Sequence, residues 1–245
     1  MKTVAVVQAR MGSSRLPGKV MMPLAGRPMI DHVLERTARI EGVDEVVVAV
    51  ADGPEDVRLA DHVRTTTSHP VVEGPEDDVL GRYVLAARRR EADVVVRITG
   101  DCPLISPRVS GRVLRAFFDG STDCDYASNT LVRTYPRGLD TEVLSRRALE
   151  RVDAEATTAS QREHVTLRIA QDPRGFRRRS VEARCVYPRY RWTVDTEADY
   201  RLVRRIFDAL MPTSPYFEFE DVLELMVCRR DWVRINHQVP QQRPK

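Results

Sequence analysis

Lysine is nearly absent from this chain: only three of its 39 basic residues are lysine, at positions 2, 19 and 245, and the others are arginine. Such a skew indicates a general preference for arginine, so an internal lysine is expected where a compact ammonium group is needed. Lys19 is the only lysine away from the chain ends, and it lies close to Arg10 and Arg15. Residues 8–19 are therefore the first candidate for a functional loop.

The chain also has few cysteines, no long apolar run and little excess of one charge. The four cysteines, at positions 102, 124, 185 and 228, have no C-x-x-C spacing, which favours small semi-buried thiols over a zinc site or a disulfide framework. No apolar run is long enough to span a bilayer or to serve as a signal peptide. The net charge of +3 is spread over interspersed acidic and basic residues. We therefore expect a cytoplasmic protein that binds neither nucleic acid nor a membrane.

Short β-branched runs alternate with amphipathic segments in the first 120 residues. Runs such as 46–50 and 94–96 are apolar throughout, which predicts strands with both faces covered. We expect one α/β domain, residues 1–245, with a mostly parallel sheet and helices on both faces. Its first half, 1–120, would bind the nucleotide, and 121–238 would bind an acceptor and form any dimer contact, with a frayed tail at 239–245. The predicted strands are 3–7, 45–50, 70–72, 93–98, 126–129, 139–144 and 191–194. The predicted helices are 28–40, 54–63, 76–90, 107–118, 145–152, 160–171, 197–210 and 219–228.

The loop after the first predicted strand carries a dense set of hydrogen-bond donors. Residues 8–19 read Gln-Ala-Arg-Met-Gly-Ser-Ser-Arg-Leu-Pro-Gly-Lys. Gly12 and Gly18 do not fit G-x-G-x-x-G, and Lys19 is followed by valine rather than the Ser or Thr of a Walker A loop. The glycines, serines, two guanidiniums and one ammonium nevertheless have the chemistry that holds a polyphosphate. The alternative is an ordinary solvated loop.

Two carboxylates follow predicted strands and are candidate metal ligands. Asp101 comes just after strand 93–98, with Thr99 and Gly100 before it, and suits a Mg²⁺ that also binds substrate phosphates. Asp195 directly follows the predicted strand 191–194. If that strand lies parallel to 93–98 and next to it, Asp195 would lie beside Asp101. Asp101 could instead be a turn or cap residue, and either Asp195 or Thr196 could cap the following helix.

Several motifs in order resemble a known enzyme family. Residues 6–19 followed by 24–30 resemble the opening signature of the acylneuraminate and 3-deoxy-manno-octulosonate (KDO) cytidylyltransferases. The segments that resemble the branch named for spore coat polysaccharide biosynthesis protein F are 74–83, 97–105, 128–130, 135–143, 162–166 and 191–195. The resemblance implies a Rossmann-like, glycosyltransferase-A-like fold and an enzyme that transfers CMP from CTP to an acidic sugar or related acceptor, with release of pyrophosphate.

The resemblance also implies roles for particular residues. Arg10, Arg15, Lys19 and Asp101 would be catalytic, and Asp101 and Asp195 would hold Mg²⁺. The residues expected to bind the nucleotide are Gln8, Ala9, Arg10, Gly12, Ser13, Ser14, Lys19, Asp77, Arg82, Thr99 and Gly100. The residues 76–78 differ from those of the sialic-acid and KDO enzymes, which leaves the choice of cytosine open.

The acceptor side is predicted from segments between the two metal carboxylates. The residues expected to bind a sugar acid or a phosphonate are Asn129, Asp140, Glu142, Arg162 and His164, although Arg162 and its neighbours could equally form a surface ion-pair cluster. Asp140 and Glu142 alternate on a predicted strand and so would share one face. We expect a homodimer. Two alternatives stay open: a nucleotide-sugar glycosyltransferase, whose Asp-x-Asp motif would be 123–125, and a non-catalytic nucleotide-binding protein.

Overall fold

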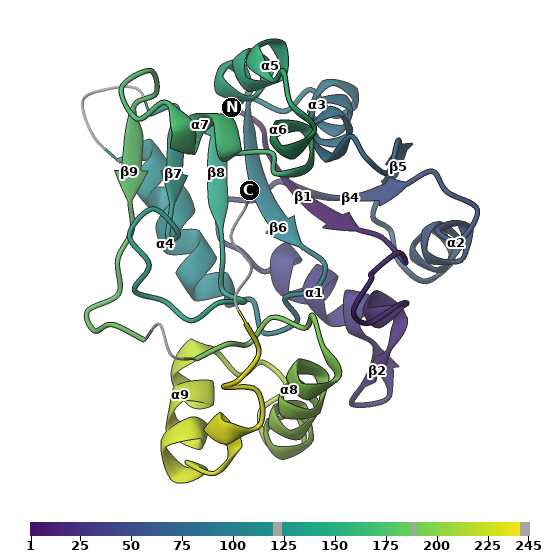
Figure 1. Cartoon of the computed structure of the whole chain (residues 1–245), viewed down its shortest axis with the longest axis vertical. Coiled ribbons are helices and arrows are strands. Elements are labelled where there is room, and N and C mark those ends of the chain that lie inside the picture. The colour runs from purple at the N-terminus through teal and green to yellow at the C-terminus, as the bar shows by residue number, and fades with distance from the viewer. Residues whose placement is uncertain (120–123, 188–189, 241–245) are drawn as a thin grey trace.

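The computed structural model describes residues 1–119, 124–187 and 190–240, and Figure 1 shows its arrangement of helices around a central sheet. The predicted frayed tail lies mostly outside the described residues. The strands of the main sheet are β1 (Thr3–Ala9), β4 (Glu45–Ala51), β5 (Val71–Gly74), β6 (Val94–Thr99), β7 (Tyr126–Ser128), β8 (Glu142–Ser145) and β9 (Arg178–Ser180). Two further strands, β2 (Pro23–Leu24) and β3 (Arg27–Pro28), form a small hairpin.

The main sheet is mostly parallel, as predicted. Its seven strands lie in the order β5-β4-β1-β6-β8-β7-β9. The strands β5, β4, β1 and β6 are parallel neighbours, β8 runs antiparallel to both β6 and β7, and β9 is parallel to β7. Only β8 is therefore reversed among the seven. The central position of β1 and β6 places the loops at their carboxyl ends side by side, where α/β folds bind ligands.

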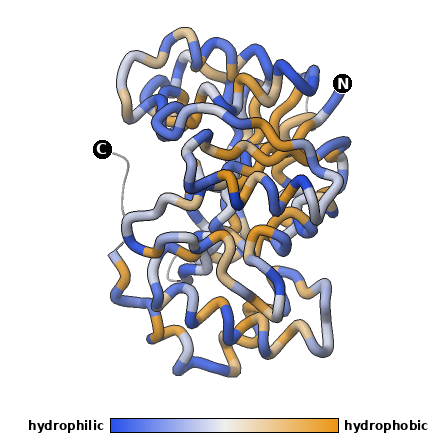
Figure 2. The backbone as a smooth tube through the Cα atoms, turned by 90° about the vertical axis from the view of Figure 1, so that its right-hand side faces the viewer, coloured by the Kyte–Doolittle hydropathy of each residue, from blue (hydrophilic) through white to orange (hydrophobic). Residues whose placement is uncertain are grey.

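The alternating side chains of the central strands supply two separate cores. Along β1, Val4 and Val6 face one side of the sheet while Ala5 and Val7 face the other, and all four are fully buried. The helices α1 (Met29–Ala38), α2 (Val57–Thr66) and α4 (Pro107–Phe118) cover one face, and α3 (Val79–Arg89), α5 (Arg146–Glu155) and α7 (Leu167–Gln171) cover the other (Figure 1). In Figure 2 the apolar stretches run through the interior of the molecule. Strands covered on both faces explain the continuous apolar runs in the sequence.

A third core lies beneath the carboxyl end of the sheet. The helices α8 (Glu197–Leu210) and α9 (Phe219–Cys228) pack there around Trp192 and form the lower part of Figure 1. Phe207 and Phe217 belong to this core, whereas the Tyr216 ring is exposed and lies 4.0 Å from the Arg39 guanidinium. Among the described residues, no helix has the length and apolar character that crossing a membrane requires.

Four elements differ from the sequence prediction. The predicted helix 160–171 is two short helices, α6 (Ala159–Glu163) and α7, and the break lets the Thr166 hydroxyl donate to the buried Glu142 carboxylate. Residues 191–194 are not a strand of the sheet, because only Arg191 forms a single bridge, to Arg137. The strand β9 was missed because its sequence is polar and it pairs on one edge only. The β2–β3 hairpin was missed because one of its two turn residues with positive φ is an alanine rather than a glycine or asparagine.

Candidate active site

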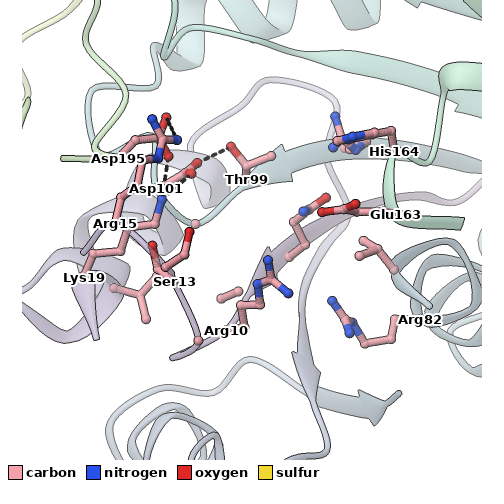
Figure 3. A pocket seen from close by; sticks show the side chains of 18 residues that line it. Arg10, Ser13, Arg15, Lys19, Arg82, Thr99, Asp101, Glu163, His164 and Asp195 are labelled. Carbon is pink, nitrogen blue, oxygen red and sulfur yellow. Dashed lines mark hydrogen bonds and ion pairs between the residues drawn. The ribbon is translucent and has the colours of Figure 1, made fainter. Parts of the chain in front are cut away.

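A cavity of about 360 Å³ opens where the loops after β1 and β6 meet (Figure 3). Of the predicted site residues, fourteen line it: Gln8, Ala9, Arg10, Gly12, Ser13, Ser14, Arg15, Lys19, Arg82, Thr99, Gly100, Asp101, His164 and Asp195. Asp77 does not, since it is exposed on the loop before α3. The parallel pairing of β1 with β6 brings Gln8 opposite Thr99, so the two loops start at the same level.

The loop between β1 and the short helix η1 (Lys19–Met21) has a defined backbone conformation. Gly18 has a φ of +69°, and its N–H donates to the Met11 carbonyl at 2.9 Å, which closes the loop just before Lys19. The Met11 N–H in turn donates to the Asp56 carboxylate. The loop is therefore held at both ends, and Gly12, Ser13 and Ser14 face the cavity.

Close approach of the two loops requires a small residue at position 100. A Cβ on Gly100 would lie 3.0 Å from both the Ala9 Cβ and the Gln8 carbonyl oxygen. The Gly100 N–H donates to that same carbonyl at 2.8 Å. The glycine before Asp101 thus allows the loop after β6 to lie directly against β1.

Lys19 lies at the centre of the polar cluster. Its Nζ donates to the Asp101 Oδ2, the Asp195 Oδ1 and the Val194 carbonyl oxygen, each at 2.8 Å. The lysine side chain is largely buried, at 11% exposure. Burial lowers the pKa of Lys19, but the two carboxylates outweigh it and raise the pKa above its ordinary 10.5. Lys19 therefore stays protonated and links two loops that are 94 residues apart in the sequence.

Asp101 stays ionised although three-quarters of its side chain is buried. Burial favours its neutral form, but the Lys19 ammonium and the hydrogen bond from the Thr99 hydroxyl outweigh that effect and hold its pKa at about 2. With a pKa that low, Asp101 is a permanent negative charge near neutral pH and a poor general base.

Asp195 is positioned by a second network. The Arg191 guanidinium donates to Asp195 and, at 2.9 Å, to Asp199. The side chain that caps α8 is Thr196, in a capping box with Asp199, so Asp195 is not the cap. The Val194 N–H donates to the Asp101 carbonyl at 2.8 Å. The two carboxylates thus meet as predicted, but through this loop contact and Lys19 rather than through neighbouring strands of the sheet.

The other two predicted cations are paired in this state of the protein. The Arg15 guanidinium lies 3.3 Å from the Asp195 carboxylate, and the Arg10 guanidinium lies 3.0 Å from that of Glu76. About a third of the Arg15 side chain and 42% of that of Arg10 are exposed. Partly exposed pairs of this kind are weak, so both guanidiniums can turn to a more highly charged ligand at small cost.

The predicted acceptor residues do not gather in one place. Asn129 is 1% exposed; its amide donates to the Leu139 carbonyl and accepts from the Thr141 N–H. It therefore holds together the two ends of the β7–β8 connection and lines none of the three cavities. Asp140 precedes β8 instead of sharing a strand face with Glu142, and it forms a bidentate pair with Arg133. The expected alternation is therefore wrong at these two positions.

Glu142 lines a second cavity of about 400 Å³ beside the main one, and His164 lines both. The Glu142 carboxylate is almost fully buried and accepts hydrogen bonds from Arg97, Tyr126 and Thr166. Burial favours its neutral form, but Arg97 and the two hydroxyls outweigh that effect and lower its pKa. Arg162 points away from both cavities, toward Asp78 and Asp153.

A family model for cytidylyltransferases matches residues 4–232 of the chain. The chain belongs to the cytidylyltransferase family. As a member it is a nucleotidyltransferase, and the order of its motifs places it in the branch of spore coat polysaccharide biosynthesis protein F. That protein from Bacillus subtilis (strain 168) is 32% identical over 209 residues, which cover 82% of this chain and 85% of the relative.

Solved structures agree with this membership. A cytidylyltransferase from Leptospira borgpetersenii serovar Hardjo-bovis (strain JB197) matches with a TM-score of 0.90 and 27% identity over 99% of both chains. A CMP:2-keto-3-deoxy-manno-octonic acid synthetase complexed with CTP matches with a TM-score of 0.65 and 26% identity, over 85% of this chain and 99% of that one. The expected Rossmann-like cytidylyltransferase fold is thereby confirmed.

Sequence reasoning missed several residues around the cavities of this cytidylyltransferase. Arg97 lines the main cavity, the second cavity and a third of about 300 Å³ that also contains Asp101 and Asp195. An arginine inside the apolar run Val94–Thr99 was the available signal. Glu163 lines the main cavity, and Arg137 and Thr193 line the third. Their positions depend on loop packing, which no local pattern reports.

The cysteines of the cytidylyltransferase are free thiols. Cys102 and Cys124 are buried, as expected, but Cys185 and Cys228 are exposed. Burial beside the Asp101 carboxylate raises the pKa of Cys102 well above its ordinary value, so this thiol is not a nucleophile.

Proposed function

We propose that this cytidylyltransferase transfers CMP from CTP to a small acidic acceptor, such as a sugar acid, with release of pyrophosphate. The observation that carries the proposal is the Lys19 ammonium, 2.8 Å from a carboxylate oxygen of both Asp101 and Asp195, at the edge of a cavity rich in cationic side chains. Such a site combines the groups that bind a triphosphate with the carboxylates that bind its counter-ion.

The reaction is a displacement at the α-phosphorus of CTP. The acceptor oxygen forms a bond to this phosphorus while the bond to the bridging oxygen of the β-phosphate breaks, and pyrophosphate carries the electron pair away. The acceptor proton passes to water, because Asp101 is too weak a base to take it. The cations Arg10, Arg15 and Lys19 stabilise the charge that develops on the departing pyrophosphate.

The two carboxylates also fit a divalent cation. Among the described residues, no group of three or more His, Cys, Asp or Glu side chains is arranged as a metal cage. Mg²⁺ is commonly held by one or two carboxylates together with substrate phosphates, and the space between Asp101 and Asp195 already stabilises one cationic group, Lys19. Asp101 and Asp195 would hold the ion, which, when bound, would neutralise phosphate charge and polarise the α-phosphoryl group.

The acceptor is best placed in the third cavity, next to the metal carboxylates. Its lining includes Arg137, Asp140 and Thr193, which offer a positive charge, a negative charge and a hydroxyl to a sugar acid. Of the predicted acceptor residues, Asp140 is the one that lines this third cavity. His164 remains at the border of the nucleotide cavity, and nothing in the geometry supports a contact of Asn129 or Arg162 with the acceptor.

Binding and turnover test the proposal separately. Thermal shift with each of the four nucleoside triphosphates and MgCl₂ should show the largest rise in melting temperature with CTP, because a ligand of the native state stabilises it. Pyrophosphate release is then measured from CTP with a panel of sugar acids and phosphonates. Release that depends on an acceptor supports the proposal. CTP binding without turnover across the whole panel would favour the non-catalytic alternative.

The glycosyltransferase alternative loses its main support. Of its Asp-x-Asp motif, Asp123 lies outside the described residues, and Asp125 is held by Arg147 and Arg177 away from the cavity. Pyrophosphate release from CTP without a sugar-nucleotide donor distinguishes the two enzymes. The homodimer stays a prediction, which light scattering on the purified protein would test.

A further inference from the structure

Arg162 is the centre of an ion-pair cluster behind the nucleotide cavity. Its Nε and Nη2 donate to the two carboxylate oxygens of Asp78 at 2.7 and 2.6 Å, and its Nη1 donates to the Asp153 carboxylate at 2.6 Å. These residues come from three elements: Arg162 from α6, Asp153 from α5, and Asp78 from the start of α3. One planar guanidinium therefore joins the first half of the chain to the second, in a bidentate geometry that lysine cannot copy.

Asp78 fixes the start of α3, whose Val79 and Arg82 line one side of the cavity. Its Oδ1 accepts the Gly81 N–H at 2.8 Å, so Asp78 is the N-cap of α3. One turn on, Arg82 donates back to the carbonyl oxygens of Pro75 and Glu76. Residues 75–78 are thus held from inside by α3 and from outside by Arg162. The Glu76 carboxylate accepts a hydrogen bond from the Arg10 guanidinium at 3.0 Å.

The residues that follow Arg162 form the opposite part of the wall. Glu163 ends α6 and His164 follows it, and both line the main cavity (Figure 3). The helix has only five residues, so it is fixed by contacts rather than by its own stability. One of these contacts is the capping box between Thr158 and Gln161, and another is the Arg162 bridge to α3.

We propose that Arg162 is a positioning residue for the nucleotide: its bridge to Asp78 holds the start of α3, with Val79 and Arg82, and the end of α6 at the separation that fits the nucleoside part of CTP. The proposal rests on CTP being the substrate. Arg162 itself touches neither CTP nor the acceptor. The triphosphate is held at the other end of the cavity, by the loop 8–19, and does not depend on the bridge.

Calorimetric titration with two probes, CTP and inorganic tripolyphosphate, each with MgCl₂, tests this role. Arg162→Ala should weaken CTP binding about ten- to a hundredfold, the size of effect that a small misplacement of binding groups produces. Tripolyphosphate binding should change less than about twofold, because a probe without a nucleoside gains nothing from this wall. Arg162→Lys should lie between wild type and Arg162→Ala for CTP, since it keeps the charge and loses the bidentate geometry.

Two further variants isolate the bridge. Asp78→Asn keeps a residue that caps helices well but removes the charge that faces Arg162, so it should reproduce the CTP effect, and the double variant should be no worse than either single one. Arg168→Ala is the matched control. Arg168 is as buried as Arg162 and also pairs with two carboxylates, Glu155 and Asp172, but it contacts no residue of the cavity wall. It should leave both affinities unchanged.

Other outcomes overturn the proposal. Equal losses for CTP and tripolyphosphate, or equal effects of Arg162→Ala and Arg168→Ala, would indicate a purely structural role. A normal CTP affinity with a raised Michaelis constant for the acceptor would make Arg162 an acceptor residue. If the wild-type protein binds tripolyphosphate but no CTP, the proposed function itself fails, and that result is read before any variant is compared.

Discussion

At the scale of single residues, rarity was a useful guide. One internal lysine in an arginine-rich chain predicted a position that needs a compact ammonium, and Lys19 lies within 2.8 Å of three oxygen atoms. The guanidinium of an arginine is too wide for that space between Asp101 and Asp195. The same reasoning was less useful for Arg162, because an arginine is ordinary in this chain and Asp78, the partner that decides its role, is distant in sequence.

Substitution of Lys19 or Asp101 should abolish transfer. We expect Lys19→Ala and Asp101→Ala to lower kcat at least about a hundredfold, since each removes a preorganised charge near the α-phosphate. Lys19→Arg should also fail, because it restores the charge without the size. Turnover is measured as pyrophosphate release with the best acceptor, and circular dichroism checks the fold. A variant with near-normal turnover would exclude that residue from the mechanism.

At the scale of elements, the loop segments 134–140 and 190–194 position the site without belonging to the sheet. The Arg137 carbonyl accepts the Trp192 N–H at 2.7 Å, and this pairing holds the segment that carries Asp195. Gly138 makes it possible, since it has a φ of +101° and a Cβ there would lie 2.5 Å from the Thr193 nitrogen. The segment 191–194 has a strand-like sequence, but it pairs with the loop around Arg137 and not with a strand of the sheet.

Gly138→Ala should therefore damage both stability and activity. The added Cβ would push apart two backbones, so we expect a loss of more than about 2 kcal/mol in the free energy of unfolding and a large fall in turnover as Asp195 moves. Gly26→Ala is the control: its φ is also positive, +80°, but nothing lies within 4 Å of its Cβ position. Its loss should be about 1 kcal/mol with normal turnover. Urea unfolding measures the stability of both variants. Equal losses of stability in Gly138→Ala and Gly26→Ala would contradict the assigned clash.

At the scale of the whole molecule, the site is built from both halves of the chain. The first half contributes Lys19 and Asp101, and the second contributes Asp195 and His164, all around one cavity. Burial of opposite charges at this junction links stability to pH. The folded pKa of Asp101, about 2, lies below its ordinary 3.8, so its ionised form stabilises the fold above about pH 4, and this contribution is lost as the pH falls toward 2.

The stabilising effect of Asp101 should thus disappear in acid. The difference in unfolding free energy between wild type and Asp101→Asn should shrink by at most about 2 kcal/mol between pH 6 and pH 2. The raised pKa of Lys19 means that no matching loss occurs on the alkaline side below about pH 10. Asp208→Asn, in an exposed pair with Arg204, is the control variant and is measured in the same way. A difference that stays constant with pH would contradict the low pKa.

The βαβ order, the buried parallel strands and the clustering of donors in the loop 8–19 were readable from sequence alone, because each depends on neighbours a few residues away. Apolar runs indicate strands that are covered on both faces, and clustered donors such as Arg10, Ser13 and Lys19 indicate a site for an anion. Packing alone decided that Asp195 reaches Asp101 through a loop, that Asn129 closes a turn and that Arg162 binds Asp78. The first and third outcomes depend on contacts between segments more than 50 residues apart in the sequence. The second depends on backbone N–H and C=O groups that lack a partner in the sheet. No local sequence pattern encodes either.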